Sequence, residues 1–242
     1  MSISNEEIMK VISETLGTDA SSNKKKKSNL TEAFVLSPKK YDIQTDVLSQ
    51  KALSANIRQF EQTVKVANDI SAKLDSADRS SANYMDSEFR ELKNAETYNL
   101  NDAFLTSLHF DNIADPTSKI MMDSLVYMRL SRDFGTFEDW QKDFIACAMS
   151  ARNGFAVTVY NGSLNRYMNV VVDDSLVGPM MNCIPVICLS VKDSFYFRDY
   201  LDDRKSYIFA MMKELRWSLV EQRVKRADQI SKIMSKPLGD QQ

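Results

Sequence analysis

The chain has one histidine, His109, among its 242 residues. Any metal site that needs three imidazole ligands from this chain is therefore excluded. Apolar stretches stay well short of the roughly 20 residues that cross a bilayer, so we expect no membrane as a partner. The sequence also lacks a Gly-rich phosphate loop and a recognisable Cys–His or Ser–His motif, which argues against several classes of enzyme.

Cysteine is scarce as well. Cys147, Cys183 and Cys188 form neither a CxxC pair nor an even disulfide framework. Their apolar neighbours predict reduced thiols in the core of a protein from a reducing compartment. The single imidazole of His109 is predicted to cap a helix end or to lie at the surface.

The composition is that of a folded protein. With 43% apolar and 10% aromatic residues, the chain is suited to one or two domains with a sizeable core. Its net charge is −2, so the chain lacks the positive electrostatic potential expected of a domain whose main function is nucleic-acid binding.

The N-terminal part is predicted to lie outside the main fold. Residues 1–17 form a short amphipathic helix that ends at Gly17 and either docks on a partner or packs on its own domain. Residues 18–40 are a flexible linker rich in Ser, Asn and Lys. Its four consecutive lysines either remain solvated or contact a phosphate backbone. They are Lys24, Lys25, Lys26 and Lys27.

Residues 41–113 are predicted to form an antiparallel helical hairpin. Apolar side chains recur in steps of three and four between residues 47 and 76, which is the seam of one long helix. The partner helix is placed at about residues 82–108. Its inward side chains are expected to be Tyr84, Phe89, Leu92, Ala95 and Leu105.

Residues 114–227 are predicted to form an α+β domain, followed by a tail over residues 228–242. Three strands are expected at 155–160, 166–172 and 184–191, with helices at about 118–131, 137–151, 195–201 and 206–226. Asn161-Gly162 is a strong hairpin signal between the first two strands. Pro185 fits the third strand only near its start or at a sheet edge. The predicted fold class is thus α+β, with an N-terminal helical hairpin and a three-stranded antiparallel sheet backed by helices.

Three segments carry a resemblance to a known family. Residues 134–140, beginning Phe134-Gly135, are similar to the FGS block of iron/manganese superoxide dismutases. Residues 185–200 resemble the family's segment that contains D-x-W-E-H, and residues 216–223 resemble its N-W-x-x-[VA]-x-x-R segment. The resemblance implies the dismutase fold over roughly residues 33 to 226.

The same resemblance implies that the family's metal ligands are replaced. Ser190 and Ser194 stand where D-x-W-E-H has its Asp and His, and Lys192 stands where it has its Trp. Counted without gaps, the histidines of the two long helices fall on Phe60 and Asn101. Hydroxyl and amide groups bind iron or manganese too weakly to substitute. The resemblance therefore predicts no metal, no cofactor and no enzymatic activity.

A dismutase-like chain with these replacements and added extensions resembles the superoxide-dismutase-like proteins of the mitochondrial small ribosomal subunit. This implies a structural role in the mitochondrial matrix, although the acidic N-terminus has no recognisable presequence. The implied partners are a paralogous dismutase-like ribosomal protein or a second copy, other small-subunit proteins, and ribosomal RNA at the periphery. The alternative is a free-standing, non-catalytic regulator that forms heterodimers with a superoxide dismutase.

Two surfaces are predicted for these partners. The family's subunits meet around Asp193 and Ser194, so a dimer interface is expected there. Basic residues near the C-terminus, together with the lysine tract, are expected to contact ribosomal RNA. They are Arg223, Lys225 and Arg226.

Overall fold

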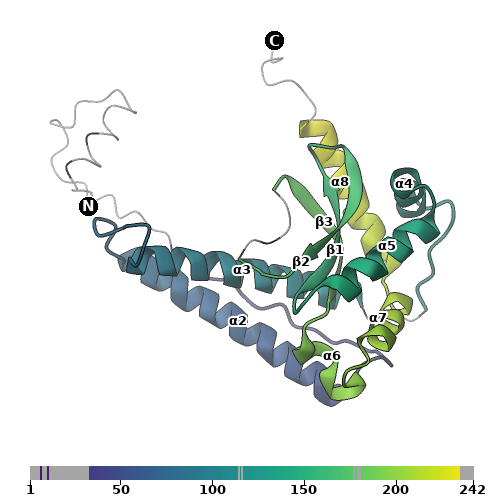
Figure 1. Cartoon of the computed structure of the whole chain (residues 1–242), viewed down its shortest axis with the longest axis horizontal. Helices are drawn as coiled ribbons and strands as arrows, with labels where there is room; N and C mark the ends of the chain where they lie inside the picture. Colours follow the sequence, from purple (N-terminus) through teal and green to yellow (C-terminus); the bar gives the residue numbers. More distant parts are fainter. Residues whose placement is uncertain are drawn as a thin grey trace, which may run out of the picture.

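The structure is a computed structural model that describes residues 33–113, 115, 117–176, 178 and 181–234, together with residues 6 and 10. Its helices are α2 (Gln50–Ser76), α3 (Glu88–Asn112), α4 (Leu125–Phe134), α5 (Phe137–Ser150), α6 (Asp193–Tyr200), α7 (Arg204–Lys213) and α8 (Trp217–Met234). Its strands are β1 (Phe155–Asn161), β2 (Arg166–Val172) and β3 (Cys183–Ser190). Figure 1 shows the α2–α3 hairpin projecting from the domain that contains the sheet. No helix in the described ranges is long and apolar enough to cross a membrane.

The hairpin forms because each long helix has a cap and an apolar seam. The hydroxyls of Ser49 and Ser87 accept hydrogen bonds from backbone N–H groups in the first turns of α2 and α3. The predicted seam of α2 is buried at Leu53, Phe60 and Leu74. Tyr84 was expected to face inward but is 86% exposed, because α3 begins only after the Ser87 cap. The hairpin itself is confirmed.

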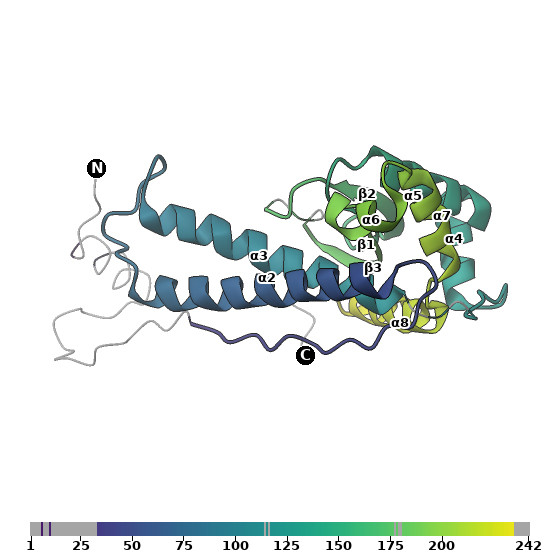
Figure 2. The same ribbon diagram turned by 90° about the horizontal axis from the view of Figure 1, so that it is seen from below.

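The chain that precedes α2 runs along the hairpin (Figure 2). The amide side chain of Asn68 on α2 accepts a hydrogen bond from the backbone N–H of Leu36 at 2.7 Å and donates one to its carbonyl at 2.9 Å. The backbone N–H of Phe34 donates to the Ser71 hydroxyl. Residues 33–40, which were predicted to belong to a flexible linker, are therefore held by α2 without forming regular secondary structure. Apart from residues 6 and 10, which are helical, residues 1–32 lie outside the described part.

The sheet has the order β2-β1-β3, and both neighbours are antiparallel to β1. Pro185 pairs with Val159 while Ile187 pairs with Thr158, which leaves Val186 as the extra residue of a β-bulge. A bulge near the start of an edge strand tolerates a residue without an N–H group, as the sequence predicted.

Helices cover both faces of the sheet (Figure 1). On one face Leu105 and Leu108 of α3 pack with Phe155 and Val157 of β1. On the other face the Trp140 indole of α5 donates a hydrogen bond to the Thr158 hydroxyl at 3.0 Å. The α+β fold class and its three-stranded antiparallel sheet are thus confirmed.

Two predicted helices differ in the structure. The helix expected over residues 206–226 is divided into α7 and α8, because the backbone N–H groups of Arg216 and Trp217 donate to the Asn112 carbonyl at 2.8 Å and to the Ser118 hydroxyl at 2.9 Å and not to the preceding helical turn. The second helix then runs on to Met234, beyond the predicted start of the tail at 228. The helix expected from 118 begins at Leu125, after the Ser124 cap.

Candidate functional site

His109 lies at the junction of α3, β3 and α6. It is in the last turn of α3, its exposed fraction is 0%, and its Nδ1 accepts a hydrogen bond from the backbone N–H of Ser190 at 3.3 Å. The ring of Phe195 lies 5.3 Å from the imidazole, edge to face, and the ring of Phe110 lies 5.7 Å away. The prediction of a surface or capping histidine is wrong, because sheet packing buries this face of α3.

Burial fixes the protonation of this imidazole. It lowers the pKa of His109 to about 3, so the ring is neutral near pH 7. A neutral imidazole has one lone pair and one N–H group. Since Nδ1 accepts from Ser190, the proton belongs on Nε2, which is buried and has no hydrogen-bond partner in the described part of the chain.

Asn56 and Ser190 complete this site. The Asn56 amide, buried on α2, donates a hydrogen bond to the carbonyl of Phe195 at 3.1 Å. The Ser190 carbonyl accepts a hydrogen bond from the Tyr207 hydroxyl at 2.8 Å, and its own hydroxyl accepts from the Lys192 backbone N–H at 3.5 Å. We call Asn56, His109, Ser190 and Phe195 the His109 site.

The four positions predicted from the family's ligands do not all meet here. Ser190 is buried beside His109, whereas Ser194 is exposed in the first turn of α6. Phe60 lies one turn beyond Asn56 and packs in an aromatic cluster with Tyr41 and Phe110.

Asn101 lies farther from the site. It precedes His109 by eight residues, which is about 12 Å along a helix, and donates to the carbonyl of Ser175 at 2.8 Å. His109 follows Leu105 by four residues on the face of α3 that is turned to the sheet, and this spacing is the signal in the sequence for its burial.

A buried ion pair beside the site was not anticipated. The Lys192 ammonium contacts the Asp102 carboxylate, with side-chain exposures of 10% and 9%, and lies 4.7 Å from the centre of the Phe155 ring. The Ser175 hydroxyl donates to the same carboxylate at 2.9 Å. Lys192, expected where the family has a tryptophan, thus ties the start of α6 to α3.

The cysteines are free thiols, as predicted. Cys188 is fully buried and its thiol contacts the carbonyl of Leu105 at 3.3 Å, while Cys147 and Cys183 are half-buried. Burial raises the pKa of all three thiols, so none has the thiolate character of a reactive cysteine.

The residues predicted to contact RNA are differently placed. Arg223 is turned inward, where its guanidinium donates to the Asn112 side chain and to the Val186 carbonyl. Lys225 and Arg226 are exposed on α8. Lys24 to Lys27 lie outside the described residues.

Comparisons with known proteins agree with this architecture. Residues 123–223 match the model of the C-terminal domain of iron/manganese superoxide dismutases. The chain is 31% identical over 163 residues to Superoxide dismutase [Fe] of Aquifex aeolicus, which covers 66% of this chain and 76% of that protein. It is 34% identical over 99 residues to Superoxide dismutase [Mn] 1 of Halobacterium salinarum, covering 41% of this chain and 49% of that protein. Superoxide dismutase [Fe] of Cupriavidus metallidurans is 27% identical over 173 residues, covering 70% of this chain and 85% of that protein.

The chain therefore belongs to the iron/manganese superoxide dismutase family. Its relatives are named as superoxide dismutases, which is an enzyme family, so the prediction that the chain is not an enzyme is wrong. The match spans about half of the Halobacterium protein.

The His109 site does not fit the metal that those names imply. It offers one imidazole whose lone pair is taken by Ser190, one amide that donates to a carbonyl, and one hydroxyl. Within the ranges that the structure describes, no group of three or more His, Cys, Asp or Glu side chains is placed to hold a metal ion. Iron and manganese require imidazole nitrogens and carboxylates that converge at bonding distance. The chain thus belongs to the family although the side chains of the His109 site do not match an iron or manganese centre.

Proposed function

We propose that this chain is a structural component of the mitochondrial small ribosomal subunit, in the mitochondrial matrix, and that it works by contacts with other proteins and with ribosomal RNA at the periphery. The observation that carries the proposal is an exposed surface on α6. Phe197 on α6 and Leu201 at its C-cap are 55% and 61% exposed, and Asp193 and Ser194 are exposed in the first turn of the same helix. Large exposed apolar side chains that cluster in this way mark protein interaction sites. We call these four residues the α6 surface.

The α6 surface is rigidly presented. The Tyr196 hydroxyl donates to the Asp193 carboxylate at 2.9 Å, and the Arg204 guanidinium donates to the Tyr196 hydroxyl at 3.0 Å. Arg204 also donates to the carbonyl of Arg152 at 2.8 Å, which ties α6 and α7 to the end of α5. A surface that is already ordered loses little conformational entropy when a partner binds. Its proposed partner is a paralogous dismutase-like ribosomal protein or a second copy of this chain.

A smaller basic surface on α8 supports peripheral RNA contact. Lys225 and Arg226 are exposed there, and Lys225 also pairs with Glu221 at 3.3 Å. Each phosphate contact releases counterions, so this part of the binding weakens as salt rises. Arg223 is not part of this surface because its guanidinium is bound inside the fold.

The test is sedimentation of a mitochondrial lysate through sucrose gradients at rising salt. We expect the chain to migrate with the small ribosomal subunit and the Phe197→Asp variant to be depleted from that fraction. Phe104→Asp is the matched control, since Phe104 is also a half-exposed phenylalanine, at 53%, but lies on α3. Migration of the unaltered chain as a small, ribosome-free species would overturn the proposal.

The second candidate is a free-standing regulator that forms heterodimers with a superoxide dismutase. The same α6 surface favours it, because this surface lies within residues 123–223, which match the dismutase domain. It predicts a ribosome-free species that contains a second dismutase chain, lost in Phe197→Asp. Metal-dependent superoxide turnover by the purified chain would contradict both candidates and favour the activity for which the relatives are named.

A further inference from the structure

Strand β2 has a free edge. The sheet order β2-β1-β3 gives β2 one neighbour, and alternate residues of such an edge direct their backbone N–H and C=O groups away from the sheet. The N–H of Tyr167 points outward, because it donates to the Asp133 carboxylate of α4 at 2.6 Å. Asn169 and Val171, two and four residues later, therefore direct their backbone groups to the same side.

The outer part of this edge is open. No hydrogen bond from the backbone N–H groups of Asn169 and Val171 to any described residue is found. The Val171 side chain is 39% exposed. Proteins usually protect an edge strand with a proline, a lysine or a bulge. Between Asn169 and Val172 the strand has none of these, and its register with β1 is continuous.

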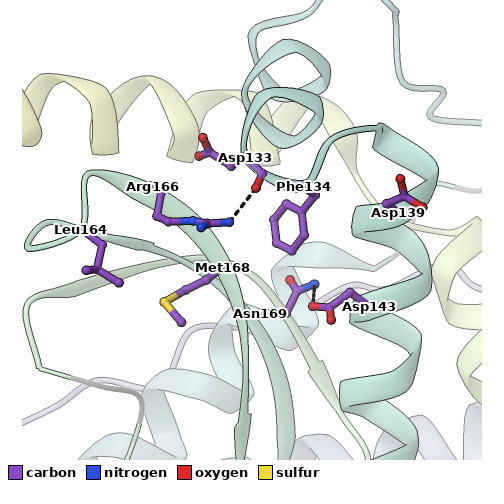
Figure 3. A pocket seen from close by; sticks show the side chains of 8 residues that line it. All are labelled: Asp133, Phe134, Asp139, Asp143, Leu164, Arg166, Met168 and Asn169. Atoms are coloured by element: carbon purple, nitrogen blue, oxygen red, sulfur yellow. Dashed lines mark hydrogen bonds between the residues drawn. The ribbon is translucent and has the colours of Figure 1, made fainter.

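A cavity of about 520 Å³ opens along the same edge (Figure 3). Arg166 and Met168 belong to one face of β2 and Asn169 to the other, and all three line the cavity. The cavity therefore lies across the edge of the strand and not on one face of the sheet. Its complete lining is Asp133, Phe134, Asp139, Asp143, Leu164, Arg166, Met168 and Asn169.

The charged residues that line the cavity favour a positively charged side chain of a bound segment. The lining holds three carboxylates and one guanidinium, and the Arg166 guanidinium donates to the backbone carbonyl of Asp133 at 2.6 Å. Arg132 neutralises the Asp133 carboxylate and the exposed Lys142 lies 3.3 Å from Asp139, so the negative charge open to a ligand is that of Asp143 and part of that of Asp139. Asp139 and Asp143 are one turn apart on α5, where the Asn169 amide donates to Asp143 at 2.8 Å. Figure 3 shows the Phe134 ring between Arg166 and these two carboxylates. An apolar ring beside carboxylates suits the methylene stem and charged end of a lysine or arginine.

We propose that the open edge of β2 and this cavity, together the β2 edge site, bind an extended segment of another protein. The segment adds to the sheet as a fourth strand through the backbone of Asn169 and Val171, and it places a lysine or arginine beside Asp139 and Asp143. The site lies on other elements than the α6 surface and does not depend on the proposed ribosomal role.

The test is direct binding of synthetic peptides to the full chain. The probe is a fluorescent, end-blocked octapeptide of alternating valine and threonine with one central lysine. Its matched forms carry glutamate in place of lysine, or N-methyl groups on alternate backbone amides. We expect the lysine peptide to bind about tenfold more tightly than the glutamate peptide, and N-methylation on the pairing edge to abolish binding.

Two pairs of variants separate the backbone from the charges. Val171→Pro removes an outward N–H that the β1–β2 ladder does not use, so it should abolish binding, whereas Val171→Thr should retain it. The double variant Asp139→Asn/Asp143→Asn should reduce the lysine preference to less than about twofold.

The proposal fails if the lysine peptide shows no saturable binding to the folded chain, or if N-methylation leaves its affinity unchanged. It also fails if the chain dimerises in solution and Val171→Pro, but not Val171→Thr, makes it monomeric, because the occupant of the edge would then be a second copy. The methylated peptide keeps the test decisive if the proline variant does not fold.

Discussion

The imidazole of His109 on α3 and the backbone of Ser190 at the end of β3 are joined by a hydrogen bond of 3.3 Å, in which Nδ1 accepts. This bond connects the helical hairpin to the sheet at a point where both residues are fully buried. It also decides the tautomer of His109 and leaves the lone pair unavailable to other groups. His109 thus joins two parts of the fold.

The stability of the protein should fall as the pH is lowered below neutrality. The pKa of His109 is about 3 in the folded protein and about 6.5 when unfolded, so the unfolded chain binds the extra proton between these values. The contribution is complete above pH 6.5 and is lost as the pH falls toward 3. We expect the free energy of unfolding to be about 2 kcal/mol lower at pH 5 than at pH 7.5.

Urea unfolding at both pH values measures this loss. Because the chain has one histidine, the control is simple: His109→Asn, whose side-chain oxygen replaces Nδ1 as acceptor, should lose much less stability over the same interval. An equal loss in that variant would show that other groups are responsible.

The side chains that face the His109 site can be tested by introducing metal-ligating residues at their positions. Asn56→His combined with Ser190→Asp would add one imidazole and one carboxylate to the site, while the Nδ1 lone pair of His109 stays with the backbone N–H of residue 190. Because that lone pair is occupied, we expect this variant to take up no more Fe²⁺ or Co²⁺ than the unaltered chain, measured by metal analysis and the visible spectrum of cobalt.

The matched control is Phe60→His with Ser190→Asp, which places the new imidazole one turn farther along α2. It should bind no more metal than the unaltered chain. Uptake of one metal ion per chain by the Asn56→His/Ser190→Asp variant alone would show that His109 gives up its bond to Ser190 and can act as a ligand.

The buried pair of Lys192 and Asp102 gives a third prediction. Lys192→Met should lower the free energy of unfolding by about 3–5 kcal/mol, because it leaves the Asp102 carboxylate buried without its counterion. Lys192→Met with Asp102→Leu should recover most of this loss. Chemical denaturation of the two single variants and the double variant gives the coupling energy. Additive losses would mean that the residues do not act as a pair.

Phe60 should tolerate no polar replacement. Phe60→His removes an aromatic contact with Phe110 at 5.9 Å and buries a polar ring, so we expect the free energy of unfolding to fall by roughly 2–4 kcal/mol. Phe104→His, at an exposed position of α3, should cost less than about 0.5 kcal/mol. Thermal unfolding measures both. A gain in stability for Phe60→His would indicate that the site accommodates an imidazole there.

The elements of the fold follow closely from local sequence. Three local signals predicted these elements: the apolar seam of α2, the Asn161-Gly162 hairpin signal between β1 and β2, and the early proline in β3. The break between α7 and α8 could not be predicted in this way. It depends on backbone N–H groups of Arg216 and Trp217 that donate to Asn112 and Ser118, which are far away in the chain.

In the candidate site, too, some features follow from local sequence and others only from tertiary structure. By itself the sequence determined that one imidazole is available, which is a matter of composition, and it predicted the strand that Ser190 ends. The replacement of family ligands by hydroxyls stays a prediction from the resemblance. Tertiary structure alone decided that Asn56 and His109, and not Phe60 and Asn101, face Ser190 and Phe195. The physical reason is that the facing residues of two long helices depend on the length of the turn between them and on where the Ser87 cap starts the second helix.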